Sequence, residues 1–540
     1  MSRWSVLVVL AAAQFLMVLD QAVMNVAISQ LVEDFDTTVT TIQAVIALYA
    51  LVMAALMMTG GKIGDLIGRR RAFAIGMLIY GTGSALTAAS WSVPTLMLGW
   101  SILEGVGAAL VLPALVALTA ATYRGGSRAV AYGVLGGIAG AGIAVGPILG
   151  GWATTELSWR VVFVGEVVVA IAILLATRVM PKAEREGERP SLDWFGSATS
   201  ALGLALMVLG VLQASNWGWL RPLDSPIEPF GFSLTPFVIA GGAVVLAGFR
   251  AWERHRERRG EEPLIHFRLF GNGMLRGGLT MLLAQNLILM GIFFTIPLFL
   301  QVVQGLDALE TGVRMLPASA GLFAAALGGS MLARRFAARP LVRTGLAIVF
   351  VSTLLLLDTI DATLDSTSFL IAMGVLGVGM GLVVSQLGNV VQSAVGDADR
   401  SEAGGLQNTA AQLGSSLGTA LLGAVVISGL VFAFSNNVES DPAISSDVKQ
   451  EVQVRLSSGG SFVSSGEVRA AAEEAQVSAA ETDAIVSGYE SAQINALKTA
   501  FLFAALIVLA SFWAARRLPA ERFEEIEAAR APPGAAAADA

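Results

Sequence analysis

The sequence contains no cysteine and only two histidines, His255 and His266, among its 540 residues. The absence of cysteine excludes disulfides and thiolate metal sites, and two histidines in one charged stretch leave little for a histidine-based metal or catalytic centre. No phosphate-binding loop of the form G-x-x-x-x-G-K-[ST] occurs, so ATP is not the expected energy source. These absences argue against a membrane-embedded enzyme, and we expect neither a metal nor an organic cofactor.

Charged residues are also scarce, at 14% of the chain, whereas a typical globular domain has roughly 25%. Hydrophobic residues make up 55%, the mean hydropathy is +0.70, and apolar runs recur along the whole chain. This pattern predicts an all-α polytopic membrane protein. The first run, residues 5–31, is too long for the core of a signal peptide and is expected to be an uncleaved span.

Fourteen apolar segments are long enough to cross a bilayer, which takes ~20 residues. Basic residues decide the orientation, because they concentrate on the cytoplasmic side. With a cytoplasmic N-terminus, 27 of the 34 Lys and Arg residues fall inside, so we expect fourteen helices with both termini cytoplasmic. The segments begin near residues 5, 42, 72, 94, 130, 160, 194, 236, 276, 312, 342, 368, 406 and 495.

Two charged cytoplasmic connectors, residues 178–193 and 250–276, bracket the seventh and eighth segments. They predict an N-terminal six-helix bundle (1–180), an inserted pair with its connectors (181–275) and a C-terminal six-helix bundle (276–515).

The longest polar segment is the extracytoplasmic loop 434–494, with ten acidic and three basic residues. Its Ala/Glu-rich parts could form short surface helices as a small cap, but we favour a solvated loop. The low-complexity end, 516–540, is expected to be a disordered cytoplasmic tail.

Glycine recurs at every fourth position within IAGAGIAVGPILGGW, residues 138–152. In a soluble helix this run would be unfavourable, since Gly costs ~1 kcal/mol and Pro ~3 kcal/mol in the interior. Inside a membrane, small residues let two helices approach closely, and neighbouring groups can satisfy the carbonyl that proline frees. The stretch therefore predicts a close-packed, bendable helix contact formed by Gly142, Gly146, Pro147, Gly150 and Gly151.

A second motif, GKIGDLIGRRR at residues 61–71, lies between the second and third predicted helices. Its glycines permit a tight turn, Asp65 can cap a helix start, and the arginines can pair with Asp65 or with phospholipid. A simple positive-inside anchor is the alternative interpretation.

These motifs resemble two signatures of the major facilitator superfamily: G-x-x-x-D-x-x-G-R-R after helix 2 and the antiporter motif G-x-x-x-G-P-x-x-G-G in helix 5. Further stretches resemble its fourteen-helix drug:proton antiporter branch (EmrB/QacA type). They are LDQAVMNVAI (19–28), SWRVVF (158–163), IPLFLQVVQGLDALETGVRMLP (296–317) and GGLQNTAAQLGSSLG (404–418).

The resemblance implies two pseudo-symmetric six-helix bundles around a central cavity that opens alternately to either side, with substrate and coupling sites near the midplane. It also implies that Gly61, Asp65, Gly68 and Arg69 form a cytoplasmic latch, and that the glycine–proline motif is a conformational element and not a ligand site.

The chain departs from the family pattern at three places. Leu66 stands where a basic residue usually follows the aspartate. Ser101 and Glu104 precede Gly105 where the family often has Arg-x-x-Gln-Gly, so the role of that arginine in proton coupling does not carry over. Glu166 replaces a common asparagine.

Three acidic residues lie inside predicted spans: Asp20, Glu104 and Glu166. An ionisable group at the bilayer centre costs ~2.5–3.5 kcal/mol, so each is a candidate for proton or substrate binding. A carboxylate that binds either a proton or a cationic ligand could couple the two by competition. The alternatives are structural hydrogen bonding for Asp20 and Glu104, and a surface pair with Arg160 for Glu166.

Polar amides on four predicted helices could line a cavity, although each could instead bond neighbouring helices. They are Gln14, Gln21, Asn25, Gln285, Asn286, Gln386, Asn389, Asn408 and Gln412.

We therefore expect a secondary transporter, not an enzyme, in the bacterial cytoplasmic membrane, exporting lipophilic and preferentially cationic compounds in exchange for protons. Its expected partners are substrate, protons and the bilayer, with no nucleic acid, and a monomer is the expected state. A dedicated exporter of one natural product, peptide or lipid remains open; an uptake symporter or a transporter-like sensor is less favoured.

Overall fold

The computed structural model describes residues 3–522 except 124–125, 181–191, 224, 334, 363, 397–398 and 458–461. Within this part of the chain the regular elements are helices, and no strand occurs. The first group comprises α1 (Arg3–Val26), α2 (Ile28–Asp34), α3 (Val39–Ile67), α4 (Arg69–Ala88), α5 (Val93–Leu96), the π-helix η1 (Met97–Glu104), α6 (Gly105–Thr122), α7 (Gly126–Glu156) and α8 (Trp159–Ala176).

The second group follows an inserted pair, α9 (Trp194–Trp217) and α10 (Thr235–Arg258). It comprises α11 (Gly273–Leu298), the π-helix η5 (Phe299–Val303), α12 (Ala308–Leu332), α13 (Ala338–Thr359), α14 (Ser366–Ser393), α15 (Arg400–Ser440), α16 (Ser446–Ser457), α17 (Ser465–Glu474) and α18 (Ala479–Ala514).

Twelve of the described helices are long and apolar enough to cross a membrane. This supports a polytopic helical membrane protein without establishing the predicted count of fourteen. The two remaining long helices, α4 and α7, also pack into the bundle: α4 lies against α6 and α8, and α7 against α1 and α12. The hydropathy of α4 is lowered by the three arginines at its start, Arg69 to Arg71.

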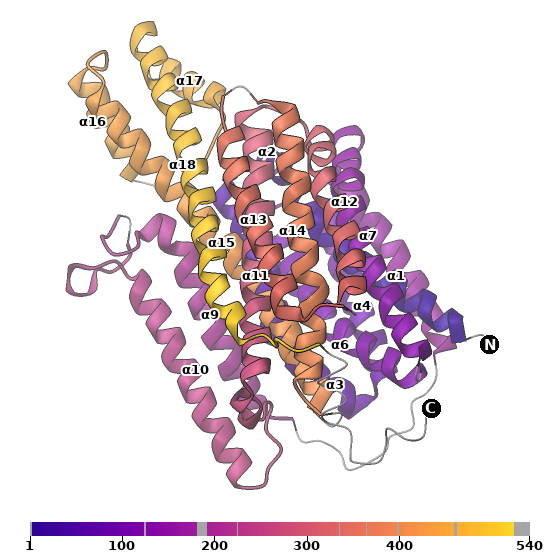
Figure 1. The fold of residues 1–540 in the computed structure, drawn as a ribbon. Helices are drawn as coiled ribbons and strands as arrows, with labels where there is room; N and C mark the ends of the chain where they lie inside the picture. The colour runs from indigo at the N-terminus through magenta and orange to yellow at the C-terminus, as the bar shows by residue number, and fades with distance from the viewer. Residues whose placement is uncertain are drawn as a thin grey trace, which may run out of the picture.

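Helices α1 to α8 form one half of the bundle, and α11 to α15 with α18 form the other (Figure 1). The halves meet through α3 against α15 and α7 against α12. The inserted pair stands beside them, because α10 packs on α9 and α9 packs on α3 and α15. Leu51, Leu204 and Val208 form the apolar contact between α9 and α3.

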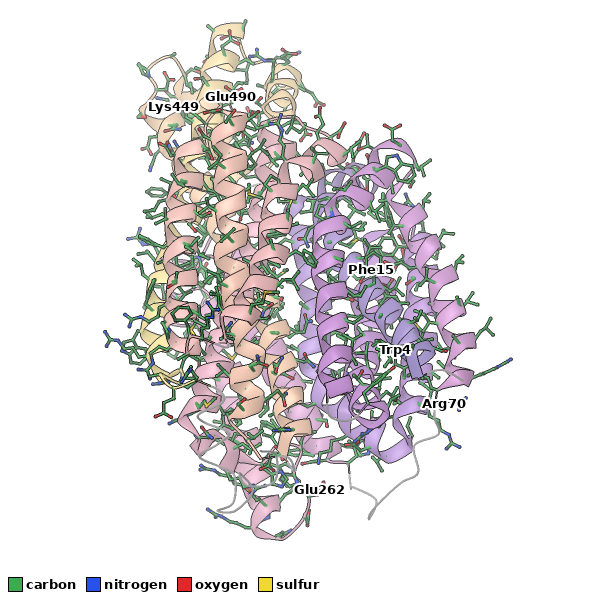
Figure 2. The ribbon with its side chains drawn as sticks, turned by 45° about the vertical axis from the view of Figure 1, so that its right-hand side comes forward. Trp4, Phe15, Arg70, Glu262, Lys449 and Glu490 are labelled. Carbon is green, nitrogen blue, oxygen red and sulfur yellow. The ribbon has the colours of Figure 1, made fainter. Side chains whose placement is uncertain are left out.

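The two ends of the bundle are easily told apart (Figure 2). Trp4, at the start of α1, lies toward the same end as Arg70 and Glu262, and we call this the terminal end. Lys449 and Glu490 lie at the opposite, distal end, where α16 and α17 project beyond the bundle (Figures 1 and 2).

The preference for a solvated loop at 434–494 is wrong. Helix α15 continues to Ser440, α16 and α17 follow, and α18 begins at Ala479. Serines cap two of these helices: Ser464 accepts from the amide of Glu467, and Ser478 from that of Glu481. Buried Phe434 and Tyr489, with ring centres 5.1 Å apart, join the extended ends of α15 and α18.

The tight turn expected across residues 61–71 is confined to one residue. Helix α3 continues through Gly61 and Gly64 to Ile67, so Asp65 lies in its last turn and does not cap the next helix. The chain turns at Gly68, whose φ of 98° favours glycine. Residues 181–191 of the predicted connector and 523–540 of the predicted tail lie outside the described residues.

Candidate functional site

The three acidic residues predicted from separate helices meet at one point in the first half. Asp20 is on α1, Glu104 ends η1, and Glu166 is on α8, and one carboxylate oxygen of each lies within 4.8 Å of the others. Each residue is at most 1% exposed. We call these residues the acid cluster.

Neutral side chains hold one oxygen of each carboxylate. Trp100 Nε1 donates to Asp20 Oδ1 at 2.6 Å, Thr87 Oγ1 donates to Glu104 Oε1 at 3.0 Å, and Tyr80 and Ser84 hydroxyls donate to Glu166 Oε2 at 3.1 and 3.3 Å.

The second oxygen of each carboxylate has no hydrogen-bond partner, and neither does the buried Tyr49 hydroxyl. No ion pair is recorded for these acids among the described residues. Three negative charges this close, away from water, would repel one another strongly. The cluster is therefore suited to holding protons and to releasing them when its surroundings change.

A hard cation is a weaker fit to the same oxygens. Calcium takes six to eight oxygen ligands and magnesium a near-ideal octahedron. Here the neighbours of the carboxylates are the Trp100 N–H and hydroxyl groups already donating to them. Such donors complement carboxylates, and they favour a proton over a metal ion as the occupant.

The surface pair between Glu166 and Arg160, the alternative role for Glu166, is not formed. Arg160 instead bonds Asp34 Oδ2 at 2.6 Å and lies over the ring of Trp159 at 4.4 Å. Burial opposes ionisation of Asp34, but hydrogen bonds from Trp159 and Arg160 lower its pKa below the ordinary value. Glu166, one and a half turns further along α8, faces α4 in the interior.

Close helix contacts build the cluster. A Cβ on Gly83 of α4 would approach Glu104 Cγ at 2.6 Å and the Gly99 carbonyl at 2.7 Å. Trp100 stacks on Tyr49 of α3 with ring centres 4.5 Å apart. The π-helix η1 thus presents Trp100 and Glu104 to the same space, and wide turns of this kind are frequent at functional sites.

Sequence reasoning missed the neutral partners of the acids. Tyr80, Ser84 and Thr87 recur at helical spacing on α4, and this one-sided polar stripe in an apolar helix is the signal that could have found them. Trp100 lies four residues before Glu104, so their common face could also have been anticipated.

A separate cavity of about 170 Å³ lies between the two halves. Four of the nine predicted amides line it, from α1 and α15. The lining residues are Gln14, Met17, Val18, Gln21, Met53, Leu112, Val116, Asn408 and Gln412.

The other five amides lie outside this lining. Asn25 and Asn286 donate to carbonyls four residues back in their own helices, those of Gln21 and Leu282. Gln386 donates to the Gly329 carbonyl and so joins α14 to α12. Gln285 is buried in α11, and Asn389 is exposed on α14.

The glycine–proline motif makes close helix contacts, as the sequence predicts, and most of them lie within the first half. On α7, Gly142, Gly146 and Gly150 face α1, where an added Cβ would press on Val18, Ala22 and Val23.

The same helix meets the second half at its distal end. An added Cβ on Gly151 would collide with the Ala308 carbonyl, and one on Gly312 with the carbonyl of Pro147. The amide of Leu309 also donates to Thr155 Oγ1 at 3.1 Å. Backbone therefore lies directly on backbone between α7 and α12.

Other bonds between the halves lie toward the same end, and together with the α7–α12 contact we call them the distal seal. Gln43 donates to the carbonyls of Thr419 and Ala420 at 2.9 and 3.0 Å. Ser416 donates to the Ala47 carbonyl at 2.7 Å, and Gln301, on η5, donates to the Val26 carbonyl at 2.8 Å.

Ion pairs predominate at the terminal end. Of the expected latch residues, Arg69 pairs with Asp65 at 3.4 Å and donates to the Ala117 carbonyl, within the first half. Lys62 pairs with Glu262 of the α10–α11 connector at 3.0 Å. That connector joins the second half through a hydrogen bond between His266 and Glu402 and an ion pair between Arg268 and Asp399, both at 2.8 Å.

Residues 10–419 match the family described as Major Facilitator Superfamily. The chain is 31% identical to the puromycin resistance protein pur8 of Streptomyces alboniger, covering 82% of this chain and 86% of the relative. It is 29% identical to the tetracenomycin C resistance and export protein of Streptomyces glaucescens (79% and 76%) and 32% identical to the cephamycin export protein CmcT of Amycolatopsis lactamdurans (78% and 85%).

Solved structures share the fold at low sequence identity. A bacterial homologue of the human lysosomal transporter Spinster, inward-facing and unoccupied, matches with a TM-score of 0.62 at 15% identity, covering 98% of this chain and 99% of that one. A D-xylose–proton symporter matches with a TM-score of 0.56 at 14% identity, covering 84% and 96%.

Proposed function

This chain belongs to the major facilitator superfamily and is a multi-pass membrane transporter, not an enzyme, and from that premise we propose that it exports antibiotic-like natural products in exchange for protons. The relatives in the comparisons carry names of antibiotic resistance and export proteins, which supports outward transport. Both a multidrug pump and a dedicated exporter agree with those names.

The proposal includes fourteen spans and membership of the drug:proton antiporter branch. Helix α4 has 20 residues and α7 has 31, which at ~1.5 Å per residue is sufficient to cross a hydrocarbon core of ~30 Å. Adding both to the twelve apolar helices gives fourteen. The basic residues at the terminal end favour a cytoplasmic position for that end.

With the terminal end cytoplasmic, the closed distal seal supports an inward-facing state in this proposal. The cavity would then receive substrate from the cytoplasm. Export requires the distal seal to open while the terminal end closes, and the backbone contacts of α7 with α12 separate in that step.

The acid cluster carries the proposal of proton coupling. In the inward-facing state its carboxylates are enclosed by α1, α3, α4 and η1, and enclosed carboxylates of like charge favour protonation. Opening to the other side exposes the cluster to a different pH and changes its proton occupancy. Proton movement down its gradient then drives the return step.

Inverted membrane vesicles with an acid interior test this function. Puromycin, tetracenomycin C and a cephamycin serve as probes, because relatives bear their names. We expect uptake of at least one probe, lost when ionophores collapse both the pH gradient and the potential. Vesicles from cells lacking the protein are the control, and uptake that persists after full collapse would rule out proton coupling.

A further inference from the structure

The cavity and the acid cluster lie on different faces of α1. Gln14, Met17, Val18 and Gln21 line the cavity at spacings of three, four and seven residues, which is one helix face. Asp20 lies roughly 110° around the helix from the centre of that face, at 100° per residue. It is fully buried and bonded to Trp100.

The cavity lining has no ionisable side chain. Four of its nine residues are amides and the remaining five are apolar. Amides both donate and accept hydrogen bonds, and Gln412 Oε1 is a buried acceptor without a partner in the structure. A charged ligand would lose its hydration here without gaining a counter-ion, which is costly.

We propose that the transported molecule is uncharged when it binds, carries hydrogen-bonding groups that the four amides recognise, and makes no contact with the acid cluster. This inference rests on the proposed export function and narrows its substrate class. It differs from the expectation of a preference for cations and of direct competition between substrate and proton at a carboxylate.

Coupling must then pass through α1 itself. Val18 lines the cavity and also packs on Gly142 of α7. A ligand that presses on Val18 therefore acts on the contact between α1 and α7, and α7 also forms the contact with α12 in the distal seal. Protonation of Asp20 acts on the opposite side of α1. The cavity of about 170 Å³ is smaller than the ~300–1,000 Å³ of drug-sized sites, so the halves must separate slightly as ligand enters.

Two probes of nearly the same shape but different charge test whether the cavity prefers an uncharged ligand. Triphenylphosphine oxide is neutral and accepts hydrogen bonds, and methyltriphenylphosphonium replaces its oxygen with a methyl group and carries a permanent positive charge. We expect the purified protein to bind the oxide at least about tenfold more tightly, measured by calorimetry at constant pH and salt.

Substitutions in the lining should move this preference, and a substitution in the acid cluster should not. Gln21→Glu is expected to favour the phosphonium by placing a carboxylate in the cavity, whereas Gln21→Met, of similar size and neutral, keeps the preference for the oxide. The ratio of the two affinities should also persist in Asp20→Asn.

The proposal would be overturned if the phosphonium bound more tightly than the oxide and Asp20→Asn abolished this preference. The acid cluster would then be interacting with the ligand. Equal affinities, or binding of neither probe, would overturn it as well. A different result would show that the proposed export function itself is wrong. In that case the vesicle assay would show no proton-driven uptake of any probe, charged or neutral.

Discussion

The two halves of the bundle differ in what they bury. The first half encloses Asp20, Glu104 and Glu166, and none of them has a basic partner among the described residues. In the described spans of the second half, the buried polar side chains are amides and hydroxyls, such as Gln285, Gln386 and Gln493. Under the proposed mechanism, the first half would hold the ionisable groups that respond to pH. The second half would supply neutral hydrogen bonds and its side of the distal seal.

The largest effect should follow from removing charge in the first half. Asp20→Asn is expected to reduce proton-driven uptake in inverted vesicles to the level of vesicles without the protein, because the amide cannot exchange a proton. Immunoblotting should show unchanged protein levels.

The matched control removes a buried polar group from the second half. Gln493→Leu loses one hydrogen bond to the Val463 carbonyl, worth about 1 kcal/mol, and should retain coupling. Coupling that survives Asp20→Asn, or that is lost equally in both variants, would contradict the division of labour between the halves.

The next largest effect concerns the contact between the halves. Gly151→Leu should reduce transport by about tenfold or more, because its side chain meets the backbone of Ala308, which cannot rotate away. Gly146→Leu should act similarly at the α1–α7 contact within the first half, where a Cβ would strike Ala22. The measurement is initial uptake rate per amount of protein.

Gly136→Leu is the control on the same helix, since no atom lies within 4 Å of a Cβ added there. Wild-type transport in Gly151→Leu would show that the α7–α12 contact does not have to close.

A moderate effect is expected at the distal seal. Gln43→Leu removes the bonds to Thr419 and Ala420. At about 0.5 kcal/mol for each lost bond, and so about 1 kcal/mol in total, the ratio of closed to open seal should fall about fivefold. Since the chain has no cysteine, a single Asn25→Cys reporter beside the Gln301–Val26 bond of the seal can be labelled with a maleimide, and its labelling rate should rise by that factor.

Gln304→Leu is the control for the seal, because Gln304 bonds the Asp361 carbonyl within the second half. An equal increase in labelling in both variants would mean that local loosening, and not separation of the halves, controls access.

The smallest effect is expected for Asp34, which forms an ion pair in the first half, unlike the residues of the acid cluster. The pKa of Asp34 is lowered, so its ion pair with Arg160 stabilises the folded protein above the ordinary aspartate pKa of 3.8 and loses this contribution as pH falls through the lower folded value. Asp34→Asn should cost up to about 1 kcal/mol at neutral pH and nothing in strong acid. Thermal unfolding at several pH values measures it, and a difference that grows in acid would contradict the assignment.

The sequence was sufficient to identify the three acids inside the spans, but it did not show that their side chains lie close together. Asp20, Glu104 and Glu166 are recognisable because each interrupts an apolar run, yet their contact depends on three helices packing together. Arg160 was matched to Glu166 by proximity along the chain, but its partner is Asp34, 126 residues away. Tertiary packing decides such pairings, and a single sequence does not encode them locally.

The predicted amides and residues 434–494 also show that a single sequence does not reveal which contacts a side chain makes. Asn25 and Asn286 bond their own helices, whereas Gln14 and Gln412 face the cavity, and composition alone gives all four the same appearance. The acidic balance of residues 434–494 indicated solvent exposure correctly but concealed helices whose serine caps and aromatic contacts hold them together.

The wide turns of the π-helix η1 determine whether Glu104 faces the other two residues of the acid cluster. Its hydrogen bonds reach five residues back, so it contains more residues per turn than an α-helix. Deleting one residue between Met97 and Glu104 would restore ordinary turns and rotate everything on one side of the deletion by about 100°. Every acid would remain in the chain, yet Glu104 would no longer face Asp20. Two transporters with the same three acids can therefore differ in whether the acids lie together. The difference requires only one inserted residue in this helix.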